Sequence, residues 1–270
     1  KPDFVIGTGG YSCAIPLYVA IKNKISTAIQ EQNVLPGMVT RKFANKVDIV
    51  FISFSETKEY LKKENYFLSG NPIRSIIKNI DSRESKIHMG LDPDKNTILI
   101  MGGSQGSKSI NEYFLKNYRK YLDEDIQFLW QTGKSCKERI KQITDSNIKK
   151  YEFIDDMDYA YSAADLVISR AGATAISEIL HLGKPSILIP YPYAADNHQE
   201  LNAKVLDGNK ASIMVMEHEL VDGVLENSIF KIIKSTETMN LFRNNALKYS
   251  IKDSSLLIKE KLAGIMLDVR

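Results

Sequence analysis

The sequence is poor in the residues that mark disulfide-stapled, metal-binding or membrane-spanning proteins. Its 270 residues include two cysteines, four histidines and one tryptophan. Cys13 and Cys136 are far apart and match no metal-ligand or redox spacing, which favours free thiols in a reducing cytoplasm. The longest apolar runs, such as residues 97–101, fall well short of the roughly 18 residues that a membrane-spanning helix needs. These shortages favour a globular protein that does not cross a membrane.

Charge is nearly balanced overall but uneven along the chain. The composition, 43% hydrophobic and 26% charged, is typical of a globular protein of one or two domains. The net charge of +3 divides into +5 for residues 1–79 and −2 for the remainder. Solvated faces account for most such differences, but a basic first part also suits a phosphorylated lipid or a bilayer surface. No basic stripe interleaved with aromatic residues is present, so we expect no nucleic-acid partner.

Strand and helix patterns alternate along the chain. Uninterrupted apolar strands such as residues 98–101 indicate a sheet that helices cover on both faces, and therefore an α/β fold with parallel strands. Gly183 and Gly208 stand where helix C-caps are expected. The predicted strands are residues 3–7, 26–30, 48–53, 97–102, 127–132, 166–170, 186–190 and 211–216, and the predicted helices are residues 110–121, 173–182, 198–206 and 220–231.

The alternation pauses between residues 70 and 95, where we expect a domain boundary. About three strands precede the pause, too few for a complete nucleotide-binding half. Residues 1–74 are therefore interpreted as a truncated first domain and residues 75–253 as a second. The chain begins at Lys1 without an initiator methionine, which agrees with a missing front segment. The helical segment 254–270 either ends the second domain or packs back on the first.

Two glycine-rich turns follow predicted strands, at residues 7–10 and 102–107. Glycine allows a close approach of backbone N–H groups to anionic oxygens, and the Ser104 hydroxyl can donate to a phosphate. Neither turn has the dinucleotide fingerprint or the Gly-Lys-Ser/Thr ending of a P-loop, which disfavours a nicotinamide enzyme and a P-loop NTPase. Secondary candidates in these turns are Gly9, Gly10, Gly103 and Gln105.

Residues 169–178, Ser-Arg-Ala-Gly-Ala-Thr-Ala-Ile-Ser-Glu, close a predicted strand and open a helix. Gly172 permits a close approach at the positive end of the helix, where Thr174 can cap an exposed N–H. Glu178 stands one to two turns into the helix, where its carboxylate can accept hydrogen bonds from both hydroxyls of a ribose. A plain helix cap would use the same residues, so both interpretations stay open here.

Three further polar clusters follow predicted strands or lie between the domains. Glu31-Gln32-Asn33 stands at a strand's carboxyl end, where open α/β sheets bind ligands. Arg74 lies in the connection and can meet a diphosphate as a bidentate donor. Residues 191–202 contain side chains suited to sugar hydroxyls, among them Asp196, Gln199 and Asn202. An acidic pair at metal-ligand spacing, residues 92–94, is interpreted as a turn, and no metal is expected.

Seven motifs in this order and spacing resemble the peptidoglycan N-acetylglucosaminyltransferase family over essentially the whole chain. They are Glu31-Gln-Asn33 with Pro36-Gly37, Gly70-Asn-Pro-Ile-Arg74, Gly102-Gly-Ser-Gln-Gly106, Phe153-Ile-Asp-Asp-Met157, Ser169-Arg-Ala-Gly-Ala173, Ser177-Glu178, and Pro190-Tyr-Pro with Ala194-Ala-Asp196, His198-Gln199 and Asn202-Ala203.

The resemblance implies two Rossmann-like domains of the GT-B type that face each other across a cleft, the first of them truncated. The second domain would bind UDP-N-acetylglucosamine and the first the undecaprenyl-diphosphate-linked acceptor. The implied reaction is inverting transfer of N-acetylglucosamine to the 4-hydroxyl of the lipid-linked N-acetylmuramoyl-pentapeptide, without a cofactor. The enzyme would work as a peripheral protein at the cytoplasmic face of the cell membrane.

The resemblance also implies roles for individual residues. Ile154 would present backbone groups to uracil, Glu178 would hold the ribose, and Gln199 with Asp196 nearby would contact the sugar. Asn33 and Arg74 are the matched residues of the first domain and the connection. The diphosphate would be held by Ser104 and by the helix start formed by Ala173, Thr174, Ala175, Ile176 and Ser177.

Two departures from the family bear on catalysis. The family's glycine-rich segment with its histidine, the expected base, would lie upstream of Lys1. Gln30 stands where the family often has a histidine, which leaves Glu31 as the titratable group nearby and the one catalytic candidate. We therefore expect the 270-residue chain to bind the nucleotide sugar but to be inactive or impaired alone.

Two other functions remain open from the sequence. The chain can be a non-catalytic UDP-sugar-binding half that needs a separate partner domain, or another GT-B glycosyltransferase or epimerase. Contact with an anionic membrane surface is suggested by apolar residues 34–35 and 38–39, which are flanked by basic residues. These basic residues are Lys22, Lys24, Arg41, Lys42 and Lys46.

Overall fold

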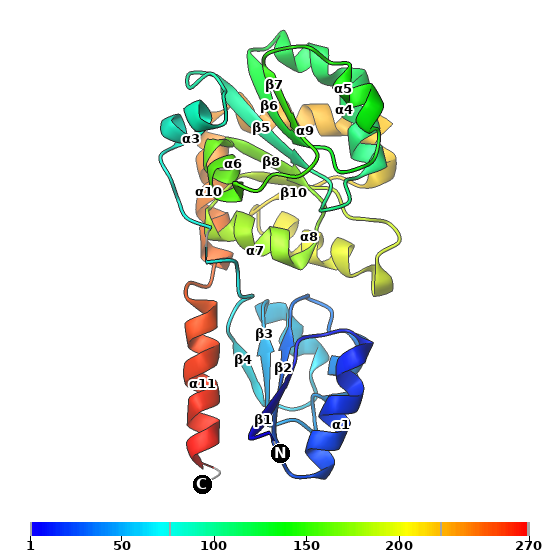
Figure 1. Ribbon diagram of the computed structural model, residues 1–270, viewed down its shortest axis with the longest axis vertical. Coiled ribbons are helices and arrows are strands. Elements are labelled where there is room, and N and C mark those ends of the chain that lie inside the picture. Colours follow the sequence, from blue (N-terminus) through cyan, green and yellow to red (C-terminus); the bar gives the residue numbers. More distant parts are fainter. Residues whose placement is uncertain (1, 76, 222, 269–270) are drawn as a thin grey trace.

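The computed structural model describes residues 2–75, 77–221 and 223–268, which form two lobes (Figure 1). The first lobe is built on a four-stranded sheet in the order β1-β2-β3-β4, and the second on a six-stranded sheet in the order β10-β9-β8-β5-β6-β7. All neighbouring strands in both sheets run parallel. Because helices connect and cover these strands, the predicted α/β class is confirmed.

The strands are β1 (Phe4–Gly7), β2 (Ser26–Glu31), β3 (Ile49–Ile52), β4 (Tyr66–Leu68), β5 (Asn96–Met101), β6 (Ile126–Gln131), β7 (Ile148–Tyr151), β8 (Leu166–Ser169), β9 (Ser186–Leu188) and β10 (Ile213–Met214). The α-helices are α1 (Ala14–Lys22), α2 (Met38–Phe43), α3 (Ser82–His88), α4 (Lys108–Leu122), α5 (Lys137–Lys141), α6 (Met157–Ala163), α7 (Ala173–His181), α8 (His198–Gly208), α9 (Val224–Ile233), α10 (Thr236–Tyr249) and α11 (Ser254–Asp268). Short 3-10 helices are η1 (Tyr11–Cys13), η2 (Ser55–Tyr60), η3 (Ala195–Asn197) and η4 (Glu217–Val221).

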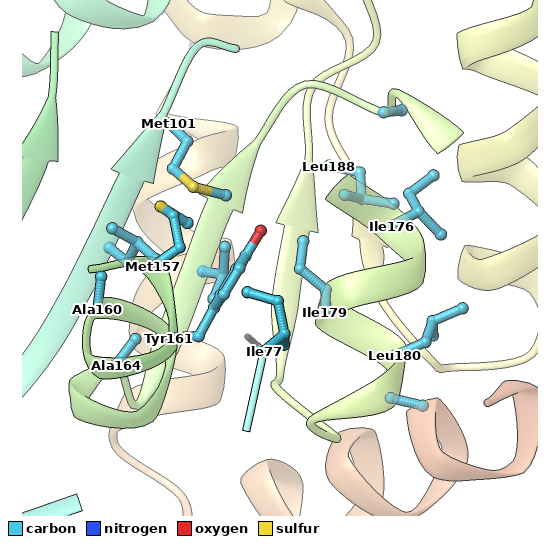
Figure 2. Close-up of a cluster of buried hydrophobic side chains, with 14 of the residues drawn as sticks. Ile77, Met101, Met157, Ala160, Tyr161, Ala164, Ile176, Ile179, Leu180 and Leu188 are labelled. Carbon is cyan, nitrogen blue, oxygen red and sulfur yellow. The ribbon is translucent and has the colours of Figure 1, made fainter. Parts of the chain in front are cut away.

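The central strands of the second sheet are buried on both faces, as their apolar sequences predict. In β5, Ile98 and Ile100 pack into one hydrophobic cluster, whereas Leu99 and Met101 pack into another on the opposite face. Figure 2 shows part of the cluster that contains Leu99 and Met101. In it, Tyr161 of α6 lies between that helix and α7. The sheet thus holds α6 and α7 rigidly at its carboxyl edge.

Sequence periodicity missed two strands, and both lie at the edges of their sheets. β4 is only three residues long and partly exposed, and β7 carries two lysines in the sequence Ile-Lys-Lys-Tyr. An edge strand has fewer covered side chains, so its apolar pattern is weak. The first sheet therefore has four strands where about three were predicted.

Two helix boundaries also differ from the sequence prediction. The helix expected from residue 220 begins at Val224, and its N-cap residue, Gly223, has a φ of 74° that is not helical. Gly208 is the last residue of α8 and no C-cap. Gly183, in contrast, follows α7 with a φ of 60°, as a C-terminal glycine should.

The two lobes are joined by the irregular segment between β4 and α3, and by the segment between α10 and α11. The predicted boundary at residue 74 falls in the first of these. α11 runs beside the first lobe (Figure 1), where Ile258, Leu262 and Ile265 pack against its sheet. Within the described residues no helix is long and apolar enough to span a bilayer.

Candidate functional site

A cavity of about 820 Å³ opens at the carboxyl edge of the second sheet. Open α/β sheets bind ligands at this edge, where strands end and helices begin. The cavity is lined by eight residues that the sequence predicted: Arg74, Gly103, Ser104, Gln105, Thr174, Ala175, Glu178 and Gln199. Residues more than 100 positions apart in the chain are therefore brought to one place.

The glycine-rich turn after β5 forms one wall of the cavity and packs backbone against backbone. A Cβ atom on Gly106 would lie 2.1 Å from the Thr132 carbonyl oxygen, and Gly106 has a φ of 78°. Gly103 has a φ of 85°, with open space where its Cβ would stand. This turn therefore requires glycine at position 106 for packing and at position 103 for backbone conformation alone.

The N-terminus of α7 forms the facing wall and carries no side-chain cap. Gly172 is the N-cap residue, and Thr174 makes no capping hydrogen bond, so the expected cap at Thr174 is wrong. The first N–H groups of the helix and its positive dipole end are thus directed at the cavity, an arrangement suited to an anion. Of the remaining helix-start candidates, Ala173, Ile176 and Ser177 do not line the cavity: the first two are buried, and Ser177 donates to the Ala173 carbonyl oxygen.

Glu178 is buried at the base of the cavity and is held from two sides. The Arg74 Nε donates to Glu178 Oε1 at 3.0 Å, and the Tyr161 hydroxyl donates to Oε2, also at 3.0 Å. Burial raises the pKa of Tyr161 well above its ordinary value, and the neighbouring carboxylate adds to this, so the hydroxyl stays a donor. Arg74, which was expected to face a diphosphate, is paired with Glu178 in this structure.

Arg170 joins the two walls of the cavity, a role that the sequence did not predict. Its guanidinium donates to the hydroxyls of Ser107 and Ser109 at 2.7 and 3.0 Å and pairs with Glu217. It also donates to the carbonyl oxygens of residues 189 and 190. An arginine directly after a strand and before a glycine-rich helix start was the available signal, and its partners could not be read from the sequence.

Ile154 follows Phe153, which lines the cavity, and a contact between its backbone and uracil stays a prediction. Its side chain is buried, it does not line the cavity, and its N–H donates to Gln131 Oε1 at 3.0 Å. Of the backbone groups of Ile154, the carbonyl oxygen is therefore the one that could accept a hydrogen bond from uracil. Gln131 also donates to the Gly103 carbonyl oxygen, so this residue, which the sequence did not single out, ties the glycine-rich turn to the loop after β7.

A smaller cavity, of about 310 Å³, lies at the carboxyl edge of the first sheet and collects the predicted residues of that lobe. Gly9, Gly10, Glu31 and Asn33 all line it. Both glycine-rich turns thus stand at the carboxyl edges of their sheets, as their positions after β1 and β5 require.

The hydrogen bonds of Glu31 do not favour the catalytic role that the sequence suggested for it. Its carboxylate accepts four hydrogen bonds, from the backbone N–H groups of Gln32, Asn33 and Gly37 and from the Thr40 hydroxyl. A carboxylate has about four lone-pair positions, so these donors use them all. Glu31 is also 4% exposed. It holds the loop after β2 in shape and has no lone pair left for a substrate proton.

The residues of the segment 191–202 have separate roles. Gln199 lines the large cavity and accepts the Tyr191 N–H at 3.0 Å. Asp196 instead pairs with Arg41 of α2 at 2.7 Å, across the space between the lobes. Asn202 is fully buried and hydrogen-bonded to the first lobe, so the expectation that it contacts sugar hydroxyls is wrong.

The acidic pair at residues 92–94 forms a turn, in which the Asp94 N–H donates to Asp92 Oδ1 at 2.9 Å. Among the residues that the structure describes, no three histidine, cysteine or acidic side chains gather into a metal-binding group.

Comparison with known proteins identifies the family. Residues 97–260 match the glycosyltransferase family 28 C-terminal domain, and residues 1–52 match the N-terminal domain of the same family. Two relatives, from Christiangramia forsetii and Listeria welshimeri, are 36% and 37% identical over 98% of this chain, which covers 73% and 75% of their lengths. Both are named UDP-N-acetylglucosamine–N-acetylmuramyl-(pentapeptide) pyrophosphoryl-undecaprenol N-acetylglucosamine transferase. The chain belongs to this glycosyltransferase family.

Solved structures of this and other families share the two-lobed fold. Acinetobacter baumannii MurG is 24% identical, covers 95% of this chain and 73% of its own, and superposes with a TM-score of 0.74. A UDP-GlcNAc 2-epimerase from Neisseria meningitidis is 17% identical over 98% of this chain and 76% of its own, and superposes with a TM-score of 0.68. The fold is thus shared by transferases and epimerases, and only the sequence relatives separate the two.

Proposed function

We propose that the chain transfers N-acetylglucosamine from UDP-N-acetylglucosamine to the 4-hydroxyl of undecaprenyl-diphospho-N-acetylmuramoyl-pentapeptide. The observation that carries the proposal is the position of Glu178: a buried carboxylate opens to the cavity one turn behind the uncapped N-terminus of α7. A nucleoside diphosphate needs an acceptor for its ribose hydroxyls and, a few ångströms away, a positive site for its phosphates. α7 supplies both.

Each side chain then has a defined task. Transfer breaks the bond between the anomeric carbon and the diphosphate oxygen while the acceptor hydroxyl attacks from the opposite face and gives its proton to a general base. The N-terminus of α7, together with Ser104, stabilises the negative charge on the departing diphosphate. Glu178 accepts the ribose hydroxyls, and Gln199 on α8 meets the sugar. When the ribose hydroxyls donate to the Glu178 carboxylate, Arg74 is released from Glu178 and becomes available to the diphosphate.

Calorimetric titration tests the donor specificity. We expect UDP-N-acetylglucosamine and UDP to bind at one site and to compete, and ADP-glucose to bind at least about tenfold more weakly, because the pocket's polar groups would be left unpaired. Incubation with UDP-N-acetylglucosamine alone should return the sugar unchanged. Equal affinity for both nucleotides, or conversion to the 2-epimer, would count against this donor and this reaction.

The first lobe exposes an apolar patch beside basic residues. The patch, called the α1 patch below, is formed by Tyr11, Ile15, Tyr18, Val19 and Met38, and exposures there reach 91%. Lys22, Lys24 and Lys42 lie nearby in sequence and are exposed. Val34, in contrast, was expected to face a membrane and is buried in the core of the second lobe. Exposed apolar side chains with basic residues nearby in sequence suit an anionic bilayer, so we propose that the protein works peripherally at the cytoplasmic face of the membrane.

Vesicle sedimentation tests the membrane contact. We expect the chain to bind vesicles that contain phosphatidylglycerol and to bind neutral phosphatidylcholine vesicles several-fold more weakly, since each basic residue contributes about 1 kcal/mol near an anionic surface. Ile15→Ser should weaken binding, whereas Leu241→Ser, which removes an exposed apolar residue from α10, should not. Vesicle binding that changes neither with lipid charge nor with added salt would contradict the proposal.

A further inference from the structure

One buried side chain, Asn202 of α8, connects three parts of the molecule. Its Oδ1 accepts the Val34 N–H of the first lobe at 3.0 Å. Its Nδ2 donates to Asn33 Oδ1 at 3.0 Å and to the Ala171 carbonyl oxygen at 3.3 Å. Val34 and Asn33 belong to the loop after β2, and Ala171 directly precedes the N-cap of α7. One amide thus contacts both the loop after β2, called the acceptor-side loop below, and the segment that leads into α7.

Both partners of this amide are fixed in place. On the first-lobe side, the Glu31 carboxylate orders the loop, and the Thr57 hydroxyl donates to the Asn33 carbonyl oxygen at 3.2 Å. The Val34 side chain itself is 3% exposed and packs into the core of the second lobe. On the second-lobe side, α8 also carries Gln199, one turn before Asn202, at the large cavity. A displacement of either loop would therefore strain the hydrogen bonds that Asn202 makes to both.

A second polar contact between the lobes, the Arg41–Asp196 ion pair, is more exposed and therefore weaker. Arg41 and Asp196 are 38% and 50% exposed in their side chains, and an ion pair at such exposure is screened by water and salt. Asn202 is 0% exposed, so its hydrogen bonds face no competition from solvent. Loss of the amide would leave the buried Val34 N–H without its acceptor.

We propose that Asn202 is a positioning residue that holds the acceptor-side loop, residues 31–37, at a fixed place relative to the start of α7 and that couples this loop to occupancy of the donor site. The consequence for transfer rests on the proposed function, because it is the sugar on α8 that the acceptor must reach. The coupling itself concerns only the two lobes and can be measured without any transfer reaction.

Amide hydrogen exchange at Val34 tests the proposal directly. In the free chain, Asn202→Ala should speed exchange of the Val34 N–H at least tenfold, because its acceptor is gone. The matched control is Gln127→Ala. Gln127 is a buried amide that likewise accepts one backbone N–H, from Asp92, and donates to the Asp92 carbonyl oxygen, but it lies at the far end of the second sheet. This control should change Val34 exchange less than twofold.

The effect of saturating UDP on Val34 exchange separates the positioning role from a general loss of stability. A general loss of stability would not abolish the response to UDP. UDP bound at the start of α7 should order that segment and slow Val34 exchange severalfold in the unaltered chain and in Gln127→Ala, but not in Asn202→Ala. Unchanged Val34 exchange in free Asn202→Ala, or equal acceleration in both variants, would overturn the positioning role. UDP that binds without any effect on Val34 would overturn the coupling. Failure of UDP to bind would instead refute the donor site.

Discussion

Replacing Glu178 by alanine is expected to lower the affinity of the chain for UDP about a hundredfold. The carboxylate would accept both ribose hydroxyls, and two hydrogen bonds to a charged group are worth about 1.5 kcal/mol each. Their combined loss, about 3 kcal/mol, corresponds to about two orders of magnitude in the dissociation constant. The substitution also leaves Tyr161, whose hydroxyl is buried against this carboxylate, without an acceptor. Calorimetry with UDP measures the effect.

The control for this experiment is Glu226→Ala. Glu226 forms an ion pair with Lys120 on the outer side of the second lobe and does not line the large cavity. Its removal should leave UDP affinity within about twofold of the unaltered chain. If Glu178→Ala retains UDP affinity to within threefold while its melting temperature is unchanged, Glu178 does not hold the ribose.

Replacing Gly106 by alanine is expected to lower the melting temperature of the second lobe by about 10 °C and to abolish UDP binding. The new Cβ would stand 2.1 Å from the Thr132 carbonyl oxygen and 2.9 Å from its carbonyl carbon, and these are backbone atoms that no rotamer change can move aside. A left-handed φ of 78° adds strain for any residue with a side chain. A total cost of about 3 kcal/mol gives a shift of this size in a lobe of this length.

Gly103→Ala separates the two causes. Gly103 has a φ of 85°, but its Cβ would meet no atom within 4 Å, so only the backbone strain of about 1–2 kcal/mol remains. We expect a fall in melting temperature of about 4 °C, measured by calorimetry or circular dichroism. Equal shifts in the two variants would show that steric contact with the Thr132 loop is unimportant.

The sequence located the large cavity because its lining residues follow strands in short, punctuated motifs. Ser104 and Glu178 stand at set distances from the ends of apolar strands, and parallel strands bring such ends to one edge. Periodicity likewise predicted the central strands, which are covered on both faces. It missed β4 and β7, since an edge strand leaves its side chains partly in solvent.

Three residues have hydrogen-bonding partners that the sequence did not reveal. Glu31 resembled an acid–base group, but three loop amides and a hydroxyl consume its lone pairs. Arg74 was expected to be open to a diphosphate, and 104 positions later Glu178 pairs with it. Asn202 was expected to meet sugar hydroxyls and is wholly buried. In each case the residue type indicated a side chain that forms hydrogen bonds, but the sequence did not show which group would be its partner.

The sequence alone determined the α/β class, the two glycine-rich turns, the helix start at residues 172–178 and the glycosyltransferase family, because each depends on residues close together in the chain. Only the tertiary structure decided which polar groups are free and which are already bonded. A hydrogen-bonding side chain acts on a ligand only if no neighbour satisfies it first. Those neighbours, such as Tyr161 for Glu178 and Val34 for Asn202, are supplied by packing between distant segments.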